Sequence, residues 1–309
     1  MTMNPSQARV IDPILTKIMQ GYRDAEFVGE ALFPRVPVSQ SGGKILTFGK
    51  EAFLSYATQR APGTDTKRIT FGFAGAPYAL ENHALEAPVP RENQRDAKVV
   101  PGVDLGQRAS AMVMRIMLRA LENQQAGLAL DAANYDGTHK VALAGGDKWS
   151  APTTSDPLGD IRAAKEAVRA SVGAYPNVML LSPVAFTALE DHPQLTDKVK
   201  YTQKGIITPE LIASVFGFDK VVIGKAIKGS EAGAFSDVWG NNAVLAYVPS
   251  IPQSMEEPSY GYTYTMEGHP LVEQPYWDPR AKSWIYGVGF ERAPVIAGMQ
   301  AGFLIQNPS

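Results

Sequence analysis

Residues 177–226 read NVMLLSPVAFTALEDHPQLTDKVKYTQKGIITPELIASVFGFDKVVIGKA, and their pattern is the most informative in the chain. The stretch opens with an apolar run at 177–182 that predicts a buried strand. A short helix is expected from Pro183, because proline is favoured in the first turn of a helix. A second helix is predicted at 208–216 and a Val-rich strand at 220–224. Strands and helices in this close succession predict a compact α/β unit.

The residues on either side of this unit continue it. Upstream, Asp156 and Pro157 predict the start of a helix, since aspartate caps helix N-termini, and Gly173 predicts its end. Downstream, the apolar run at 242–248 predicts another strand. The C-terminal part then returns to β structure, with strands predicted at 260–265, 283–288 and 302–306.

The region from Asp104 to about Asn134 carries the clearest helical pattern in the sequence. Its apolar residues recur at helical spacing, Asp104 is suited to cap the N-terminus, and no proline interrupts the region. We predict that this long helix buries a core-facing stripe made of Met112, Val113, Ile116 and Ala120. We expect its polar flank to carry Arg108, Arg115, Arg119 and Glu122.

Residues 33–90 predict a long β-hairpin. Strand-like runs at 44–48 and 68–73 flank a polar tip at 56–67 that contains a Pro-Gly pair. Because an isolated two-stranded hairpin is only marginally stable in water, we expect this one to lie against another surface. The same alternation would also fit the edge of an ordinary sheet, and that alternative stays open.

The N-terminal residues 1–32 mix short apolar groups with polar ones and contain two prolines. We predict one short helix at 13–21. The rest of this segment is expected to form an arm that becomes ordered on a partner surface.

The composition limits the classes of function. Lys and Arg total 29 against 31 Asp and Glu, so the net charge does not direct the chain towards nucleic acid. The absence of cysteine excludes disulfides, thiolate catalysis and cysteine-ligated metals. No apolar run approaches the roughly 20 residues of a membrane helix, and the N-terminus lacks the pattern of a secretion signal. We therefore expect a soluble protein, made in a cytoplasm, with no membrane partner.

Familiar catalytic motifs are missing from the sequence. It contains no Walker A loop, no Gly-x-Ser-x-Gly elbow and no His-Glu-x-x-His. The four histidines are scattered one per region, and we expect each at a surface or turn position: His83, His139, His192 and His269. The sequence thus predicts a protein that is not an enzyme, with no catalytic, metal-binding or cofactor-binding residues.

The order of the predicted elements carries more information than any motif. An extended arm, a long hairpin, a long helix, a compact α/β unit and a return to β resemble the major capsid proteins of tailed phages, which have the Hong Kong 97 fold. Residues 177–226 are also similar to the A-domain of that family. Both have a strand ending in Ser-Pro, a helix, His-Pro, a Lys-rich segment with Tyr, a helix starting Thr-Pro-Glu, and a Val-rich strand.

The resemblance implies an α+β fold with six segments. These are an N-arm at 1–32, an E-loop hairpin with its return strand at 33–90, a P-domain with the spine helix at 91–150, an A-domain at 151–254, a P-domain β return at 255–292, and a C-terminal strand at 293–309 that rejoins the A-domain.

The resemblance also implies a function, namely self-assembly into the icosahedral head that encloses double-stranded DNA. The implied partners are copies of the chain in pentamers and hexamers, portal, scaffold and decoration proteins, and non-specifically held DNA. The implied location is the virion, assembled in the host bacterial cytoplasm. Candidate inter-subunit contacts in the E-loop are Phe48, Phe53, Tyr56, Arg60, Lys67, Phe71 and Phe73. The founding member of the fold forms lysine–asparagine cross-links; no matching set is evident in this chain, so non-covalent stabilisation is expected.

Two alternatives remain open at the level of sequence. An encapsulin, the shell of a cellular nanocompartment, has a similar fold and would enclose a cargo enzyme without DNA. A soluble α/β enzyme with an atypical site, such as a hydrolase, would instead form a small oligomer with a ligand pocket.

Overall fold

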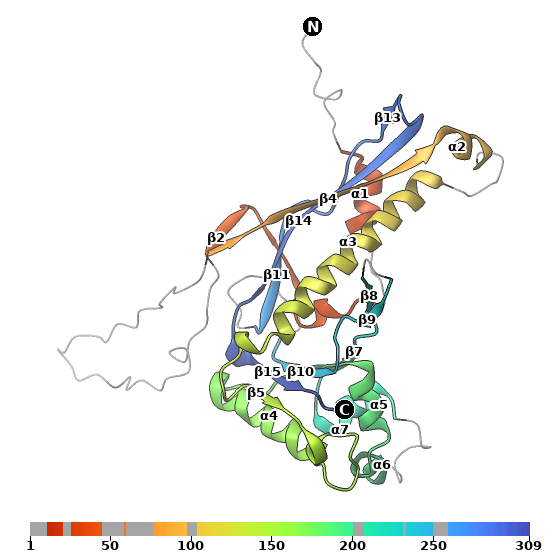
Figure 1. Cartoon of the computed structure of the whole chain (residues 1–309). Helices are drawn as coiled ribbons and strands as arrows, with labels where there is room; N and C mark the ends of the chain where they lie inside the picture. Colours follow the sequence, from red (N-terminus) through yellow and green to blue (C-terminus); the bar gives the residue numbers. More distant parts are fainter. Residues whose placement is uncertain are drawn as a thin grey trace.

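The computed structural model describes residues 11–20, 26–44, 59, 77–97, 104–199, 207–230, 233–249 and 259–309. They form an elongated molecule with two sheets and one long helix that runs from the first sheet towards the second (Figure 1). That helix, α3, spans Leu105–Leu130. The fold is a mixed α+β arrangement, as expected.

The first sheet is organised around the long strand β14 (Ser283–Ile296). Strands β4 (Glu81–Pro90), β11 (Gly261–Met266), β12 (Leu271–Val272) and β13 (Tyr276–Asp278) all pair with β14 in antiparallel fashion, and β1 (Arg35–Val38) pairs with β11 in parallel. Helix α3 packs across one face of this sheet. The short helix α1 (Pro13–Gln20) packs beside α3 and β12, and α2 (Arg91–Ala97) follows β4.

The second sheet has five strands in the order β5-β15-β10-β6-β7. Their bounds are Lys140–Ala142, Gly302–Gln306, Asn242–Ala246, Val178–Leu181 and Lys220–Ile223. Four helices pack on one face of this sheet, α4 (Pro157–Val172), α5 (Pro183–Glu190), α6 (Pro193–Val199) and α7 (Pro209–Phe216). The second sheet therefore lies between two apolar clusters, one shared with these helices and one shared with the C-terminal end of α3.

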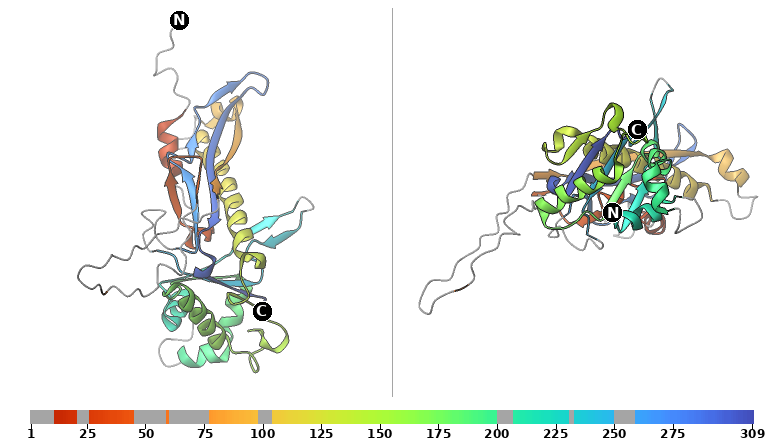
Figure 2. Two further views of the ribbon diagram at one scale, coloured as in Figure 1. Left: turned by 90° about the vertical axis from the view of Figure 1, so that its left-hand side faces the viewer. Right: turned by 90° about the horizontal axis from the view of Figure 1, so that it is seen from below.

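Two small two-stranded ribbons are hydrogen-bonded to neither sheet, although Tyr78 of the first ribbon packs on Tyr264 of the first sheet. The first joins β2 (Gly42–Lys44) to β3 (Pro77–Ala79), and the second joins β8 (Ile227–Gly229) to β9 (Phe235–Asp237). Figures 1 and 2 show the β8–β9 ribbon extending away from the body of the molecule. The described residues also contain short 3-10 helices at Gly29–Ala31, Ala132–Asn134, Gly145–Asp147 and Met299–Ala301.

The local sequence explains where the helices begin and end. The Asp104 carboxylate accepts hydrogen bonds from the backbone N–H groups of the first turn of α3, and Asp156 does the same for α4. Gly173 and Gly217 end α4 and α7 with φ angles of 74° and 67°, in the left-handed region that glycine adopts without strain. The predicted starts of these helices are confirmed, although α3 ends at Leu130, before the predicted limit.

Candidate functional site: the junction and outer face of helix α3

One face of α3 is buried against the first sheet. Val113, Met114, Met117, Leu118 and Leu121 are each no more than 5% exposed and form one apolar cluster with side chains of β4 and β14. Because apolar burial contributes roughly 25 cal/mol per Å², this contact fixes the helix firmly on the sheet. The prediction that Val113 faces the core is confirmed.

The prediction that Met112, Ile116 and Ala120 face the core is wrong. Met112 is 57% exposed, Ile116 is 45% exposed, and Ala120 is also exposed. Helix α3 has apolar residues on two sides, and at 100° per residue Ile116 lies on the side opposite Leu118 and Leu121. We call Met112, Ile116 and Ala120 the outer stripe of α3.

Arginines border the outer stripe. Arg108 and Arg119 are exposed, as predicted for a polar flank. Arg115 is also exposed on this flank, and its Nη2 donates to Glu26 Oε2 at 2.8 Å. The exposed side of α3 thus combines apolar side chains with a row of positive charge.

Glu122 departs from the predicted polar flank, because it is buried at 2% exposure. Its Oε1 accepts from Trp239 Nε1 at 2.7 Å and from the Val28 N–H at 3.0 Å, and its Oε2 accepts from the Gly29 N–H at 2.8 Å. Burial raises the pKa of Glu122, while the hydrogen bonds from Trp239, Gly29 and Val28 act in the opposite direction. These four residues, which we call the junction, join the N-terminal segment, the long helix and the second sheet.

The surroundings of the junction are closely fitted. A Cβ atom on Gly224 would lie only 2.2 Å from the Trp239 ring, so glycine is needed there for the indole to reach Glu122. One turn along α3, Gln125 Nε2 donates to Thr263 Oγ1 at 2.9 Å, and Thr263 Oγ1 donates to the Phe33 carbonyl at 3.0 Å. The junction therefore continues into the first sheet through hydrogen bonds.

A buried arginine ties the first sheet to the middle of α3. Arg292 is 0% exposed, and its Nη1 donates to the Met117 carbonyl at 2.8 Å. Its Nε and Nη2 atoms have no hydrogen-bond partner within the part of the chain that the structure describes. Burial, followed by the nearby positive charge of Arg35, lowers the pKa of Arg292 to about 9.

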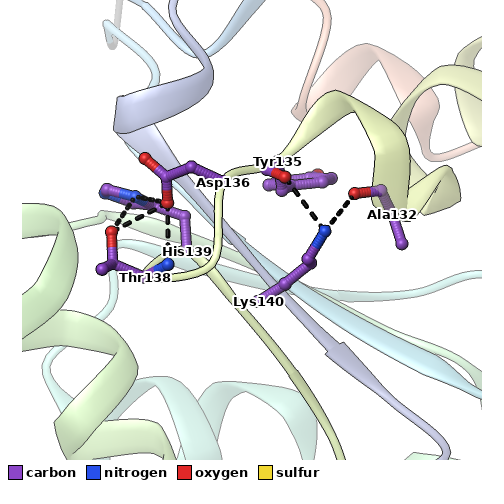
Figure 3. A network of polar contacts seen from close by, with 6 residues as sticks. All are labelled: Ala132, Tyr135, Asp136, Thr138, His139 and Lys140. Carbon is purple, nitrogen blue, oxygen red and sulfur yellow. Dashed lines mark hydrogen bonds and ion pairs between the residues drawn. The ribbon is translucent and has the colours of Figure 1, made fainter.

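The turn between α3 and β5 is held by side chains of its own residues (Figure 3). His139 Nδ1 donates to Asp136 Oδ1 at 2.8 Å, and the Thr138 N–H and hydroxyl donate to the same oxygen. The hydrogen bond from His139 is the largest reason why the pKa of Asp136 falls to about 2. Lys140 Nζ reaches back to the carbonyl groups of Ala132 and Tyr135 at 2.7 and 3.1 Å.

The sequence predicts a surface or turn position for each histidine, and this is wrong for His83, which lies half-buried in strand β4. The other three lie in turns, but His139 is only 2% exposed and His192 only 1% exposed. Each is buried because its ring completes hydrogen bonds inside a tight turn. Nothing in the sequence signals this.

Among the residues that the structure describes, Ser155 and His192 come closest to a catalytic pair. The Gln194 N–H donates to His192 Nδ1, so Nε2 carries the proton and donates to Ser155 Oγ at 3.1 Å. The Ser155 hydroxyl in turn donates to the Ala151 carbonyl at 2.7 Å. Since the serine proton points away from the imidazole, the histidine is not placed to activate the serine.

The described residues contain no cluster of three or more His, Asp or Glu side chains placed to hold a metal ion. Nor does any helix among them have the length and apolar character needed to cross a bilayer. The E-loop contact residues predicted from the sequence lie outside the described residues: Phe48, Phe53, Tyr56, Arg60, Lys67, Phe71 and Phe73.

Comparison with known proteins agrees with this architecture. The family model described as "Phage major capsid protein E" matches residues 117–274. The major capsid protein of Burkholderia phage BcepMu is 37% identical over 308 residues, covering 98% of each chain. A phage-related protein from Bordetella bronchiseptica RB50 has 50% identity and a TM-score of 0.86, covering 98% of this chain and 99% of its own.

More distant structures share the fold alone. The capsid structure of Cyanophage P-SCSP1u has 10% identity and a TM-score of 0.59, covering 99% of this chain and 93% of its own.

A long helix laid across a β14-centred sheet, with a separate α/β body at one end, is the Hong Kong 97 fold. The chain belongs to the family of phage major capsid proteins, and its function is that of a major capsid protein of a tailed phage. The resemblance stated from the sequence is therefore confirmed. The encapsulin alternative is not supported by these full-length phage relatives, and neither is the soluble enzyme.

Proposed function

We propose that copies of this chain assemble into a closed icosahedral head of pentamers and hexamers that encloses double-stranded DNA. The observation that carries the proposal is the outer stripe of α3. A helix that is apolar on two sides buries one side within the subunit and leaves the other exposed, with Met112 at 57% and Ile116 at 45%. Such a surface is suited to burial by a neighbouring copy.

Each segment of the subunit is proposed to correspond to one part of the Hong Kong 97 fold. Residues 1–32 serve as the N-arm, 33–90 as the E-loop, 91–150 and 255–292 as the P-domain, and 151–254 with 293–309 as the A-domain. The pairing of β15 with β10 supports the last grouping. The pairing of β15 with β5 adds 140–142 to the A-domain sheet.

The E-loop is the proposed arm between subunits, with the seven aromatic and basic residues named above as its contact residues. A long two-stranded hairpin gains stability by lying on another surface. The proposal places that surface on a neighbouring copy, held without covalent cross-links.

The remaining partners follow from the assembly of a head. Portal and scaffold proteins are proposed to act during assembly in the host bacterial cytoplasm, and a decoration protein to coat the finished shell. The chain has nearly balanced charge, with 29 Lys and Arg against 31 Asp and Glu, so it is proposed to hold DNA as a wall, without sequence-specific binding and without catalysis.

Deletion of residues 56–67 tests the proposed hairpin contact. The deleted subunit is expected to remain soluble and folded, because the tip is polar in sequence, while closed shells are lost. Sedimentation and electron microscopy of the deleted and full-length proteins, prepared in parallel, measure the outcome. Normal shells from the deleted protein would overturn the proposed role of the hairpin.

A further inference from the structure

The β8–β9 ribbon projects from a well-anchored base. The Val238 N–H donates to the Ala226 carbonyl at 2.9 Å, and both residues are no more than 5% exposed. The next residue, Trp239, is fully buried and donates to Glu122 in the junction. The direction of the ribbon is thus set by the core of the subunit.

The ribbon has an apolar face that the subunit leaves exposed. Ile227 pairs with Asp237 and Gly229 pairs with Phe235, so Ile227 and Phe235 lie on the same face. Ile227 is 50% exposed, and Phe235 is 75% exposed, with its ring beside Gly229. A two-stranded ribbon is marginal in water and gains stability when such a face is covered.

A cleft of about 400 Å³ lies between the base of the β2–β3 ribbon, the C-terminal part of α3 and the end of β14. Its walls combine apolar groups with a carboxylate and an amide, from Tyr78, Glu81, Gln124, Gly127, Leu128 and Pro294. Gln124 Oε1 is buried and has no hydrogen-bond partner in the described part of the chain. A Cβ atom on Gly127 would meet no atom within 4 Å, so the cleft is open at that point.

The ribbon and the cleft lie on opposite sides of α3. Figure 1 shows β8–β9 to one side of the helix and β2 to the other, and both views in Figure 2 keep them apart. A projection on one side and a cleft on the other fit a head-to-tail contact, which closes into a ring when it is repeated by rotation.

We propose that Phe235 and Ile227 of one copy enter the cleft of the next copy around a ring of subunits. Each ribbon edge carries backbone N–H groups outside the β8–β9 ladder, and these can donate to Gln124 Oε1. The inference rests on the proposed assembly of copies into a shell.

Cysteine trapping tests this contact cleanly, because the chain has no cysteine of its own. Assembled particles carrying Phe235→Cys with Gly127→Cys are oxidised and run on a non-reducing gel. The matched control pairs Phe235→Cys with Val184→Cys, since Val184 is 44% exposed on α5 and lies outside the cleft. The expected result is a ladder of linked subunits from the first pair, at least tenfold above the control. Equal linking in both pairs would overturn the proposal.

Filling the cleft provides a second test that does not depend on disulfide geometry. Gly127→Phe is expected to leave the melting temperature of the subunit close to that of the wild type and to reduce shell yield at least tenfold. Gly127→Ala, which leaves the cleft open, is expected to assemble normally. Normal shells from Gly127→Phe would overturn the proposed contact while leaving the assembly function intact. A wild-type chain that never forms shells would instead overturn the assembly function, and this contact with it.

Discussion

Trp239 donates its indole N–H to Glu122 at 2.7 Å, across 117 positions of the chain. Trp239 belongs to the loop between β9 and β10, while Glu122 lies in the long helix that packs on the first sheet. The same carboxylate accepts two backbone N–H groups from Val28 and Gly29. One acidic side chain therefore connects three parts of the subunit that are distant in sequence.

Replacement of Glu122 by Gln tests this connection. The variant keeps the shape of the side chain but replaces one acceptor oxygen by an NH₂ group that faces N–H donors. Buried hydrogen bonds to a charged group contribute about 1.5–3 kcal/mol each, so a clear loss of stability is expected. Thermal melting should show a lower Tm for Glu122→Gln, with Arg119→Gln as an exposed control on the same helix. Equal Tm values for the two variants would contradict the connecting role of Glu122.

The two faces of α3 are expected to respond differently to truncation. Met117→Ala should cost about 2–5 kcal/mol of folding free energy, because Met117 is 4% exposed in the core. Ile116→Ala should change subunit stability by about 0.5 kcal/mol or less, as is usual for exposed positions. Denaturant unfolding of the two subunits measures this difference. If the assembly proposal holds, Ile116→Asp should fold and yet lose shells; normal shells from that variant would count against the outer stripe as a contact.

Arg292 offers a test of a buried charge. Arg292 is 0% exposed, and its one hydrogen bond within the described residues goes to the Met117 carbonyl. Replacing buried charges by apolar groups of similar size is often neutral or stabilising by about 1–4 kcal/mol. We therefore expect Arg292→Met to keep or raise the Tm of the subunit, and Arg292→Ala to lower it by leaving a cavity. A large fall in Tm for Arg292→Met would show that the buried charge is itself stabilising.

Acid should weaken the turn after α3 through Asp136. Its pKa is lowered from 3.8 to about 2, mainly by the hydrogen bond from His139. A carboxyl group whose pKa is lowered by folding stabilises the folded state at pH values above its pKa in the unfolded chain. That contribution is lost as the pH falls from about 4 towards 2. Melting curves from pH 5 to pH 2 should therefore converge for the wild type and Asp136→Asn. A difference that stays constant over this range would contradict the role of the ionised carboxylate.

The local structure of this protein, above all the starts and ends of its helices, could be predicted from the sequence. Caps such as Asp104 and Asp156, together with the left-handed glycines Gly173 and Gly217, act within a few residues of their own position. Their effects can be inferred from neighbouring residues alone. The order of these elements was enough to suggest the fold.

The orientation of α3 could not be predicted in the same way. Apolar residues lie both on the side of the helix that carries Ile116 and on the side that carries Leu121. Only the contact with β14 decides which of the two sides is buried. The burial of Glu122 was missed because its donors come from Val28, Gly29 and Trp239, which are distant in sequence. No local pattern encodes such a meeting, nor the pairing of a ribbon with a cleft on another copy.

Copies of this chain are proposed to form the wall of a phage head. Electron microscopy of particles purified from a phage lysate, with the wall subunit identified by mass spectrometry, tests this assembly. We expect closed icosahedral shells built from this chain, each with a tail at one vertex. A discrete monomer or dimer as the only form of the chain, both in the lysate and under assembly conditions, would contradict it.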